Sequence, residues 1–257
     1  ERFLQVRGWR GGWDYFLRLS ENLSTLTSRS FGVIDGVKSG RFSIGLTIDF
    51  LAGIEPELDF RYGKPVMIFP AQIGRLAGSN APELACDFVG FVLSDAGQRL
   101  LLQPGVGRVP ALASVRDGAG DAVPELMRHA IHLKWQTYDA GLAERRYWAV
   151  NALFDIFISD RLPQRRELWA RLRALQGRAP GDELARVERL LTALPVDEAE
   201  ALSPDLNSRP GRITDLTAMT PAQKAAHDRW VVAADAALSQ ADTALHRLEL
   251  AADEATP

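Results

Sequence analysis

The stretch that decides the predicted fold is Leu93-Ser94-Asp95-Ala96-Gly97-Gln98-Arg99-Leu100-Leu101. It closes an apolar segment that begins at Pro82 and carries Glu83, a carboxylate of the kind that the first turn of a helix favours. Asn80 lies just ahead of this segment and is predicted to cap the helix. We therefore predict a helix over residues 82–93, followed at once by a tight turn.

The spacing within this segment resembles that of the extracytoplasmic solute-binding proteins that serve ABC importers. In that family, one helix follows the pattern Asn-Pro-Glu-x-Ala-x-x-Phe, then apolar residues, then Leu-Ser-x-x-Gly-Gln. The positions that match are Ala85, Phe88, Val89, Phe91, Val92, Leu93, Ser94, Gly97 and Gln98. The resemblance implies the type 2 periplasmic-binding-protein fold, in which two lobes are joined by crossover strands.

A second stretch lies upstream and is similar to the ligand-facing part of the second lobe in the same family. It consists of residues 26–37, Ser39-Gly40 and residues 44–50. The branch with the greatest similarity includes phosphoglycerate transport regulatory proteins and binders of ferric ion and organophosphates. The resemblance implies that most of the first lobe is missing and would precede Glu1.

Hydrophobic patterning divides the chain into three expected segments. Residues 1–62 are predicted to form a second-lobe α/β segment, because residues 43–50 are nearly continuously apolar, as in a strand buried on both faces. Residues 63–113 are predicted to hold crossover strands, with extended segments at 59–62 and 64–69, and the first-lobe helix. Residues 114–257 are rich in alanine, leucine and arginine and are predicted to be helical. The expected fold class is therefore α/β, periplasmic-binding-protein-like, with a mainly helical C-terminal extension.

Helical periodicity supports this division on both sides of the predicted strands. Trp9, Trp13, Phe16 and Leu17 form the apolar stripe of a helix that is expected to end near Glu21. In the last segment, the periodicity predicts helices over residues 125–139, 145–159, 163–177, 182–194 and 221–253.

Composition excludes several classes of protein. The chain has 257 residues, of which 46% are hydrophobic, and a net charge of -3 from 30 basic and 33 acidic residues. Because these charges are mixed along the chain, nucleic-acid binding is not expected. The single cysteine, Cys86, excludes an internal disulfide and a thiolate zinc site. No apolar run approaches the roughly 20 residues that a membrane-spanning helix needs.

The candidate ligand site begins at Ser28, Arg29 and Ser30, which precede a predicted helix ending at Gly40. Free amides at a helix start, two hydroxyls and a guanidinium together suit an anionic oxygen group such as phosphate. The alternative is an N-cap serine beside an arginine that faces solvent. Asp49 is expected at the carboxyl end of a buried strand, where α/β sheets gather ligand groups.

Asp35 and Ser39 are predicted to line the same cleft, although a charged helix face is commonly just solvated. Relatives that bind ferric ion carry paired tyrosines after the strand, whereas this chain has Asp49-Phe50 and a single Tyr62. The last metal candidate is the pair His129 and His132, spaced three residues apart on a predicted helix, where the alternative is histidines facing solvent or a neighbouring helix.

No catalytic motif is found: the sequence lacks a nucleophile elbow, a phosphate loop, a dinucleotide fingerprint and a zinc helix. We therefore predict that the chain is not an enzyme and needs no cofactor. The resemblance implies a periplasmic or extracytoplasmic substrate-binding component of an ABC-type importer. It would bind a small anionic, phosphorylated organic solute by cleft closure and meet ABC permease membrane subunits, with a membrane sensor kinase as a further partner. The alternatives are a ferric-ion-binding transport protein, or a helical interaction or sensor module without ligand binding.

Overall fold

The computed structural model describes residues 1–63, 66, 68, 71–128, 138–207 and 219–254. The chain forms two compact units, which we call the terminal unit (Glu1–Leu26 with Thr137–Pro257) and the middle unit (Thr27–Gln136). The segment boundaries predicted at 62/63 and 113/114 both fall inside the middle unit.

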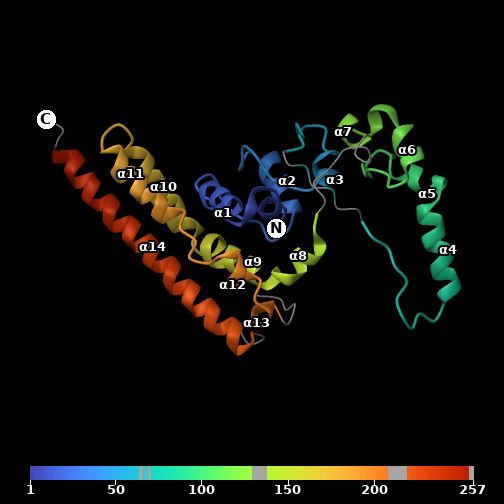
Figure 1. Cartoon of the computed structure of the whole chain (residues 1–257). Helices are drawn as coiled ribbons and strands as arrows, with labels where there is room; N and C mark the ends of the chain where they lie inside the picture. The colour runs from blue at the N-terminus through green and yellow to red at the C-terminus, as the bar shows by residue number, and fades with distance from the viewer. Residues whose placement is uncertain (64–65, 67, 69–70, 129–137, 208–218, 255–257) are drawn as a thin grey trace. The chain divides into compact units, whose positions relative to one another are not determined.

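The predicted α/β class is wrong, because the regular elements in the described ranges are helices and none is a strand (Figure 1). Ser43–Ile48 forms no regular element and is not paired with a second described segment, and Asp49 begins a short helix instead of ending a strand. A strand exists only when a neighbour completes its ladder of hydrogen bonds, so an apolar run alone does not make one. Residues 59–62 are likewise unpaired, and most of 64–69 lies outside the described residues.

The terminal unit is a bundle built from both ends of the chain (Figure 1). Its elements are α1 (Arg2–Leu19), α8 (Ala140–Arg145), α9 (Tyr147–Phe154), the π-helical turn η3 (Asp155–Ser159), α10 (Leu162–Ala174), α11 (Gly181–Leu191), α12 (Glu198–Ala201), α13 (Pro204–Asn207) and α14 (Pro221–Glu254). The predicted core stripe of α1 is confirmed in that Trp9, Trp13 and Leu17 are buried. Helix α1 bends at Gly8, whose φ of 74° is a conformation that glycine adopts without strain.

Helix α14 has 34 residues and is therefore about 51 Å long. Its first half contributes Trp230 and Ala234 to a core shared with α1, α9 and η3. Its second half contributes Leu238, Ala241 and Leu245 to a second core with α10 and α11. The spacing of these residues keeps one face of α14 on the bundle, so this single helix joins two hydrophobic cores.

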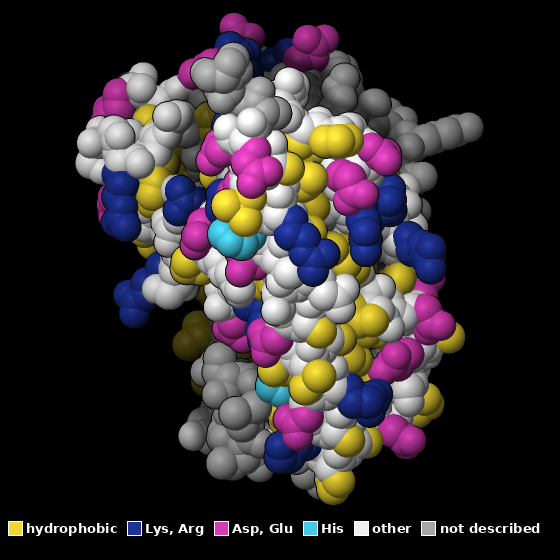
Figure 2. Space-filling model, turned by 90° about the vertical axis from the view of Figure 1, so that its left-hand side faces the viewer, with side chains coloured by type: hydrophobic (Ala, Val, Ile, Leu, Met, Phe, Trp, Pro, Cys, Tyr) yellow, Lys and Arg dark blue, Asp and Glu magenta, His cyan; other side chains and the backbone are white. Residues whose placement is uncertain are grey.

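Arginines on and beside α10 pair with carboxylates spaced along the flank of α14. Arg161 pairs with Asp235 at 2.8 Å, Arg171 with Asp242 and with Glu249, and Arg178 with Asp253 at 2.9 Å. Asp235, Asp242 and Glu249 are seven residues apart, a spacing that returns each to the same side of a helix. The ion pairs thus border the apolar contact between the two helices. Figure 2 looks onto the molecule from the side that lies on the left of Figure 1 and shows acidic and basic side chains interspersed there.

The middle unit consists of shorter elements and two small clusters of buried residues. Its elements are α2 (Phe31–Lys38), α3 (Asp49–Ala52), α4 (Pro82–Leu93), α5 (Asp95–Leu100), α6 (Ala113–Asp117), the 3-10 turn η1 (Gly120–Ala122) and α7 (Glu125–Arg128). One cluster joins α2 to α3 through Ile34, Leu51 and Ala52, and the other contains Val66, Val123 and Met127. Of the helices that the structure describes, none combines the length and apolarity required to cross a membrane.

The helix predicted over residues 82–93 is confirmed as α4. Its predicted cap is wrong, because the N-cap position is occupied by Ala81, which offers no side-chain acceptor, and not by Asn80. A proline at the start of α4 compensates in part, since proline has no N–H group that would need a partner there.

Candidate functional site

The residues predicted to bind an anion lie in the bend before α2. Ser28 and Arg29 are exposed, and Ser30 is the N-cap residue but makes no side-chain capping bond. Two amides at this helix start already donate to the bend, from Gly32 to the Arg29 carbonyl at 3.0 Å and from Val33 to the Ser30 carbonyl at 3.2 Å. Fewer free amides therefore remain for an anion than the sequence pattern suggested.

Asp49 makes a local hydrogen-bonded pair. Its Oδ2 accepts from the Tyr62 hydroxyl at 3.0 Å, and its Oδ1 accepts from the Phe50 amide at 2.8 Å. Burial, and then the Asp49 carboxylate, raise the pKa of Tyr62 well above its ordinary value. Because both oxygens are already engaged, Asp49 holds the first turn of α3 and the segment around Tyr62 together.

The six predicted ligand residues are spread along α2 and beyond it. Ser28–Ser30 precede the eight-residue helix, Asp35 is exposed on it, and Ser39 follows it, donating to the Gly36 carbonyl at 3.3 Å. The two ends of such a helix are about 12 Å apart. Within the described ranges no side-chain hydrogen bond joins any two of the six residues, and their shared role stays a prediction.

Metal binding gains no support from the described residues, which include no group of three or more His, Cys, Asp or Glu side chains placed to hold an ion. His129 and His132 lie outside the described residues. Tyr62, the one tyrosine near Asp49, is engaged with that carboxylate.

The Leu93–Leu101 stretch forms a tight junction between α4 and α5. Ser94 caps α5 by accepting from the Gly97 amide at 3.2 Å, and its hydroxyl donates to the Phe91 carbonyl at 2.7 Å. Gln98 is buried, donates to the Val92 carbonyl at 2.8 Å and accepts from the amides of Ala111 and Leu112. The hydrogen bonds of Ser94 and Gln98 therefore fix the orientation of α4 relative to α5 and the segment at Ala111 and Leu112.

Replacing Gly97 with alanine is expected to destabilise this junction by roughly 2 kcal/mol, the cost typical of an overpacked site. A Cβ atom at Gly97 would lie 2.2 Å from the Phe91 carbonyl oxygen, and backbone atoms have no room to move away. The measurement is amide hydrogen exchange over residues 82–100, which should become faster.

Gly90→Ala is the matched control, because Gly90 lies inside α4 and a Cβ atom there would meet nothing within 4 Å beyond the backbone of its own helix. Alanine favours a helix over glycine by up to about 1 kcal/mol, so exchange in α4 should slow. Faster exchange in both variants would contradict the clash that we assign to Gly97.

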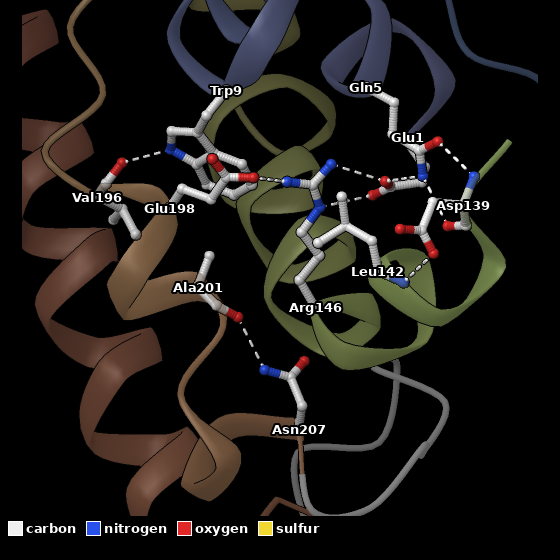
Figure 3. Close-up of polar contacts among 10 residues, drawn as sticks. All are labelled: Glu1, Gln5, Trp9, Asp139, Leu142, Arg146, Val196, Glu198, Ala201 and Asn207. Carbon is white, nitrogen blue, oxygen red and sulfur yellow. Dashed lines mark hydrogen bonds and ion pairs between the residues drawn. The ribbon is translucent and has the colours of Figure 1, made fainter. Parts of the chain in front are cut away.

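A buried arginine in the terminal unit organises the polar network shown in Figure 3. Arg146 is 1% exposed and donates to both carboxylate oxygens of Glu1, at 2.7 and 3.1 Å, and to Glu198. Its guanidinium also lies over the Trp9 ring, 5.3 Å from the centroid. Burial alone would raise the pKa of Glu1, but the hydrogen bonds from Arg146 and Gln5 outweigh it and lower the pKa below 4.5.

Gln5 and Asp139 extend this network along the start of α8 (Figure 3). Gln5 donates to the Asp139 carbonyl at 2.9 Å and accepts from its amide at 2.8 Å, while the Asp139 carboxylate caps α8 through the Leu142 amide. The network thus fastens α1 to α8 and α12. Every carboxylate in it has a cationic or amide donor, which is the arrangement of a structural clamp.

A second buried arginine, Arg165, donates hydrogen bonds to the C-terminal ends of two helices. It donates to the Ser20 hydroxyl at 3.0 Å and to the carbonyls of Leu17 and Leu191, at the C-terminal ends of α1 and α11. A cation is favourable there because the helix dipole places partial negative charge on these carbonyls. Burial lowers the pKa of Arg165 to about 10, so the side chain stays charged at neutral pH.

Helix α4 exposes large apolar side chains that the described part of the chain does not cover. No residue of α4 is buried, and its inner stripe, Ala85, Val89 and Val92, is only half-buried. Leu84, Phe88, Phe91 and Leu93 are exposed by 69%, 58%, 49% and 54%. Leu84, Phe88 and Phe91 follow the i, i+4, i+7 spacing of one helix face, and exposed apolar area of this kind marks a surface that a partner covers. This stripe, Leu84, Phe88 and Phe91, is the leading candidate functional surface, and Leu93 lies on another side of the helix.

The apolar pattern of α4 was present in the sequence, but its interpretation depended on an assumed neighbour. The apolar positions that matched a family pattern predicted a helix without saying which of them a neighbour covers, and the structure exposes half of them. Arg146 and Arg165 were missed because their partners lie far away in sequence.

The chain is similar in sequence to a phosphoglycerate transport regulatory protein. The chain is 33% identical over 204 residues to the phosphoglycerate transport regulatory protein PgtC of Salmonella typhimurium, and equally to that of Salmonella typhi. The match covers 78% of this chain and 50% of each relative, so the chain spans about half the length of the curated relatives it matches. No family model and no solved structure matches.

These findings correct the assignment to the solute-binding proteins of ABC importers. The relatives are described as transport regulators, and the described residues form helices without the strands of a periplasmic binding fold. The predicted role as a substrate-binding importer component with a type 2 periplasmic-binding-protein fold is therefore wrong. The chain is similar over most of its length to regulatory proteins of phosphoglycerate transport.

Proposed function

We propose that this chain is a protein-docking component in the regulation of phosphoglycerate transport, with α4 as its docking helix. The observation that carries the proposal is the exposed apolar stripe of α4, defined by Leu84, Phe88 and Phe91. The similarity to the regulatory proteins supports the assignment of this docking to the regulation of phosphoglycerate transport. The role is one of binding, without a catalytic step.

The terminal unit acts as the stable body in this proposal. Its apolar side chains fill two cores, whereas most of the large apolar side chains that are exposed in the described residues belong to the middle unit. Exposed apolar area of this kind marks a surface that a partner covers. Docking is therefore assigned to the middle unit and not to the helices of the C-terminal segment.

The chemistry of α4 selects a protein partner over a lipid surface. Its charged residues are Glu83 and Asp87, and it has no lysine or arginine, whereas helices that lie on membranes are rich in basic residues. With twelve residues, α4 is about 18 Å long and too short to span a bilayer. The partner that fits has an apolar groove with basic side chains beside the first two turns of α4.

Complementation in Salmonella typhimurium tests this role. The matched region of PgtC is replaced by this chain in a strain that lacks the native protein, and phosphoglycerate uptake is measured with and without inducing phosphoglycerate. We expect the chimera to restore regulated uptake and its Phe88→Ser/Phe91→Ser form to lose it at an equal protein level.

The matched control is Val232→Ser/Leu250→Ser, because both of these apolar residues are exposed on α14. This form should regulate uptake as the unaltered chimera does. If the α4 variant restores regulation equally well, α4 is not the docking helix. A chimera that never restores uptake would contradict the assignment to phosphoglycerate transport.

A further inference from the structure

The run Ser43–Ile48, between α2 and α3, has one apolar face turned to solvent. Ile44, Leu46 and Ile48 are 85%, 73% and 49% exposed, whereas Gly45 and Thr47 between them are half-buried. Ile48 has φ −83° and ψ 141°, which lie in the extended region of backbone angles. This alternation is the period of a β-strand, in which successive side chains point to opposite faces.

The other face of the run rests on α2. A Cβ atom at Gly45 would lie 2.4 Å from Val33 Cγ1 and 3.1 Å from Val37 Cγ2, so glycine is required for this close approach. The run is therefore backed by a helix, as one strand of a layered structure would be. Its exposed face lies on the side away from that support.

The backbone of the run is unpaired as well. Over the part of the chain that the structure describes, the N–H and C=O groups of Ser43–Thr47 make no hydrogen bond to another backbone group. The run also carries no charge and no proline, the residues that usually block a strand edge from pairing. It presents both the hydrogen-bonding groups and the apolar face of a strand edge.

We propose that Ser43–Ile48 binds an extended segment of a partner polypeptide by strand addition. A strand satisfies the free N–H and C=O groups, and its alternate apolar side chains extend the layer of Ile44, Leu46 and Ile48. A partner helix or a lipid tail would cover the side chains but leave these backbone groups unpaired. About five partner residues, or roughly 17 Å of strand, match the run.

This inference rests on the proposed docking role and adds to it the kind of segment that a partner supplies. The middle unit would then have two binding surfaces. Helix α4 would contact a partner through side chains alone, and Ser43–Ile48 would also form backbone hydrogen bonds. The two surfaces are separable by mutation, because they lie on different elements.

The test uses the full chain and a short fluorescent peptide that alternates valine and threonine between terminal lysines. Binding is followed by fluorescence anisotropy and by amide hydrogen exchange. We expect saturable binding that slows exchange at residues 43–48. Methylation of alternate peptide nitrogens, on the edge that pairs, should weaken binding at least tenfold.

Two variants of the chain sharpen the result. Leu46→Asp places a charge on the apolar face and should weaken peptide binding at least tenfold, while Val232→Ser at an exposed apolar position of α14 should leave it unchanged. Three peptides are compared: one methylated on one edge, one methylated on the other edge, and one without methylation. Equal affinity for all three would overturn strand addition.

Two further outcomes also overturn the proposal. One is a dimer that Leu46→Asp dissociates in sedimentation while the peptide does not bind, which would assign the run to a second copy of the chain. The other is Leu46-dependent binding to phosphatidylglycerol vesicles without peptide binding. Neither outcome touches the α4 result in Salmonella, so failure here is distinguishable from failure of the docking role.

Discussion

Replacing Leu245 with alanine is expected to lower the free energy of unfolding of the terminal unit by about 3 kcal/mol, within the range for a fully buried leucine. Leu245 is 0% exposed and lies in the core that α14 shares with α10 and α11. Its loss removes apolar contacts and leaves a cavity that two flanking helices can fill only in part. Urea unfolding followed by tryptophan fluorescence measures the change.

Leu250→Ala is the control, because Leu250 lies on the same helix but is 53% exposed. The change in helix propensity is the same for both leucines, so the difference between the variants isolates burial. We expect a loss under roughly 0.5 kcal/mol for Leu250, as for most surface positions. The fluorescence reports the intended unit because Trp9, Trp13, Trp148, Trp169 and Trp230 are buried there. Equal losses in both variants would contradict the packing of the second half of α14.

The sequence predicted best those elements whose determinants are local. Helix α14 was predicted over residues 221–253 and is observed over 221–254, and α4 was predicted over its observed range. In both, the apolar period alone specifies a helix whatever lies beside it. The core role of Trp9, Trp13 and Leu17 followed from the same period.

The strand predicted over residues 43–50 failed because strand formation is not a local property. Ser43–Ile48 has the composition of a strand, but the described residues supply no second strand to pair with it. At Asp49 the chain turns into α3, where the carboxylate engages Tyr62. The prediction depended on a sheet that a family resemblance implied and that these residues do not form.

The polar networks were beyond prediction for a related reason. The contacts between Arg146 and Glu1 join residues 145 positions apart, and those between Arg146 and Glu198 join residues 52 apart. No periodic pattern links such positions, and arginine is common in exposed parts of this chain. The candidate docking surface was visible as an apolar stripe on α4, but whether that stripe is covered depends on tertiary structure.

Replacing Arg146 with methionine is expected to destabilise the terminal unit by about 3 kcal/mol at neutral pH, the cost of removing one partner of a buried ion pair. Methionine keeps the apolar stem but leaves the Glu1 carboxylate, whose side chain is 18% exposed, without its cation. Glu198 contributes less to the loss because its side chain is 44% exposed. Urea unfolding followed by circular dichroism measures the effect without relying on Trp9, which contacts the guanidinium.

The pH dependence distinguishes this ion pair from a simple packing defect. Arg146 and Gln5 hold the pKa of Glu1 below 4.5 in the folded chain, so the pair contributes stability above pH 4.5 that is lost as the pH falls through the lowered pKa. In Arg146→Met the ion pair with Arg146 is gone, so protonation of Glu1 no longer breaks it. The gap between the two proteins should therefore be largest at neutral pH and shrink below pH 4.5. Arg145→Met, at an exposed neighbouring position, should change stability by less than roughly 0.5 kcal/mol. A loss that is constant with pH would show that Arg146 stabilises the bundle by packing over Trp9 and not by its charge.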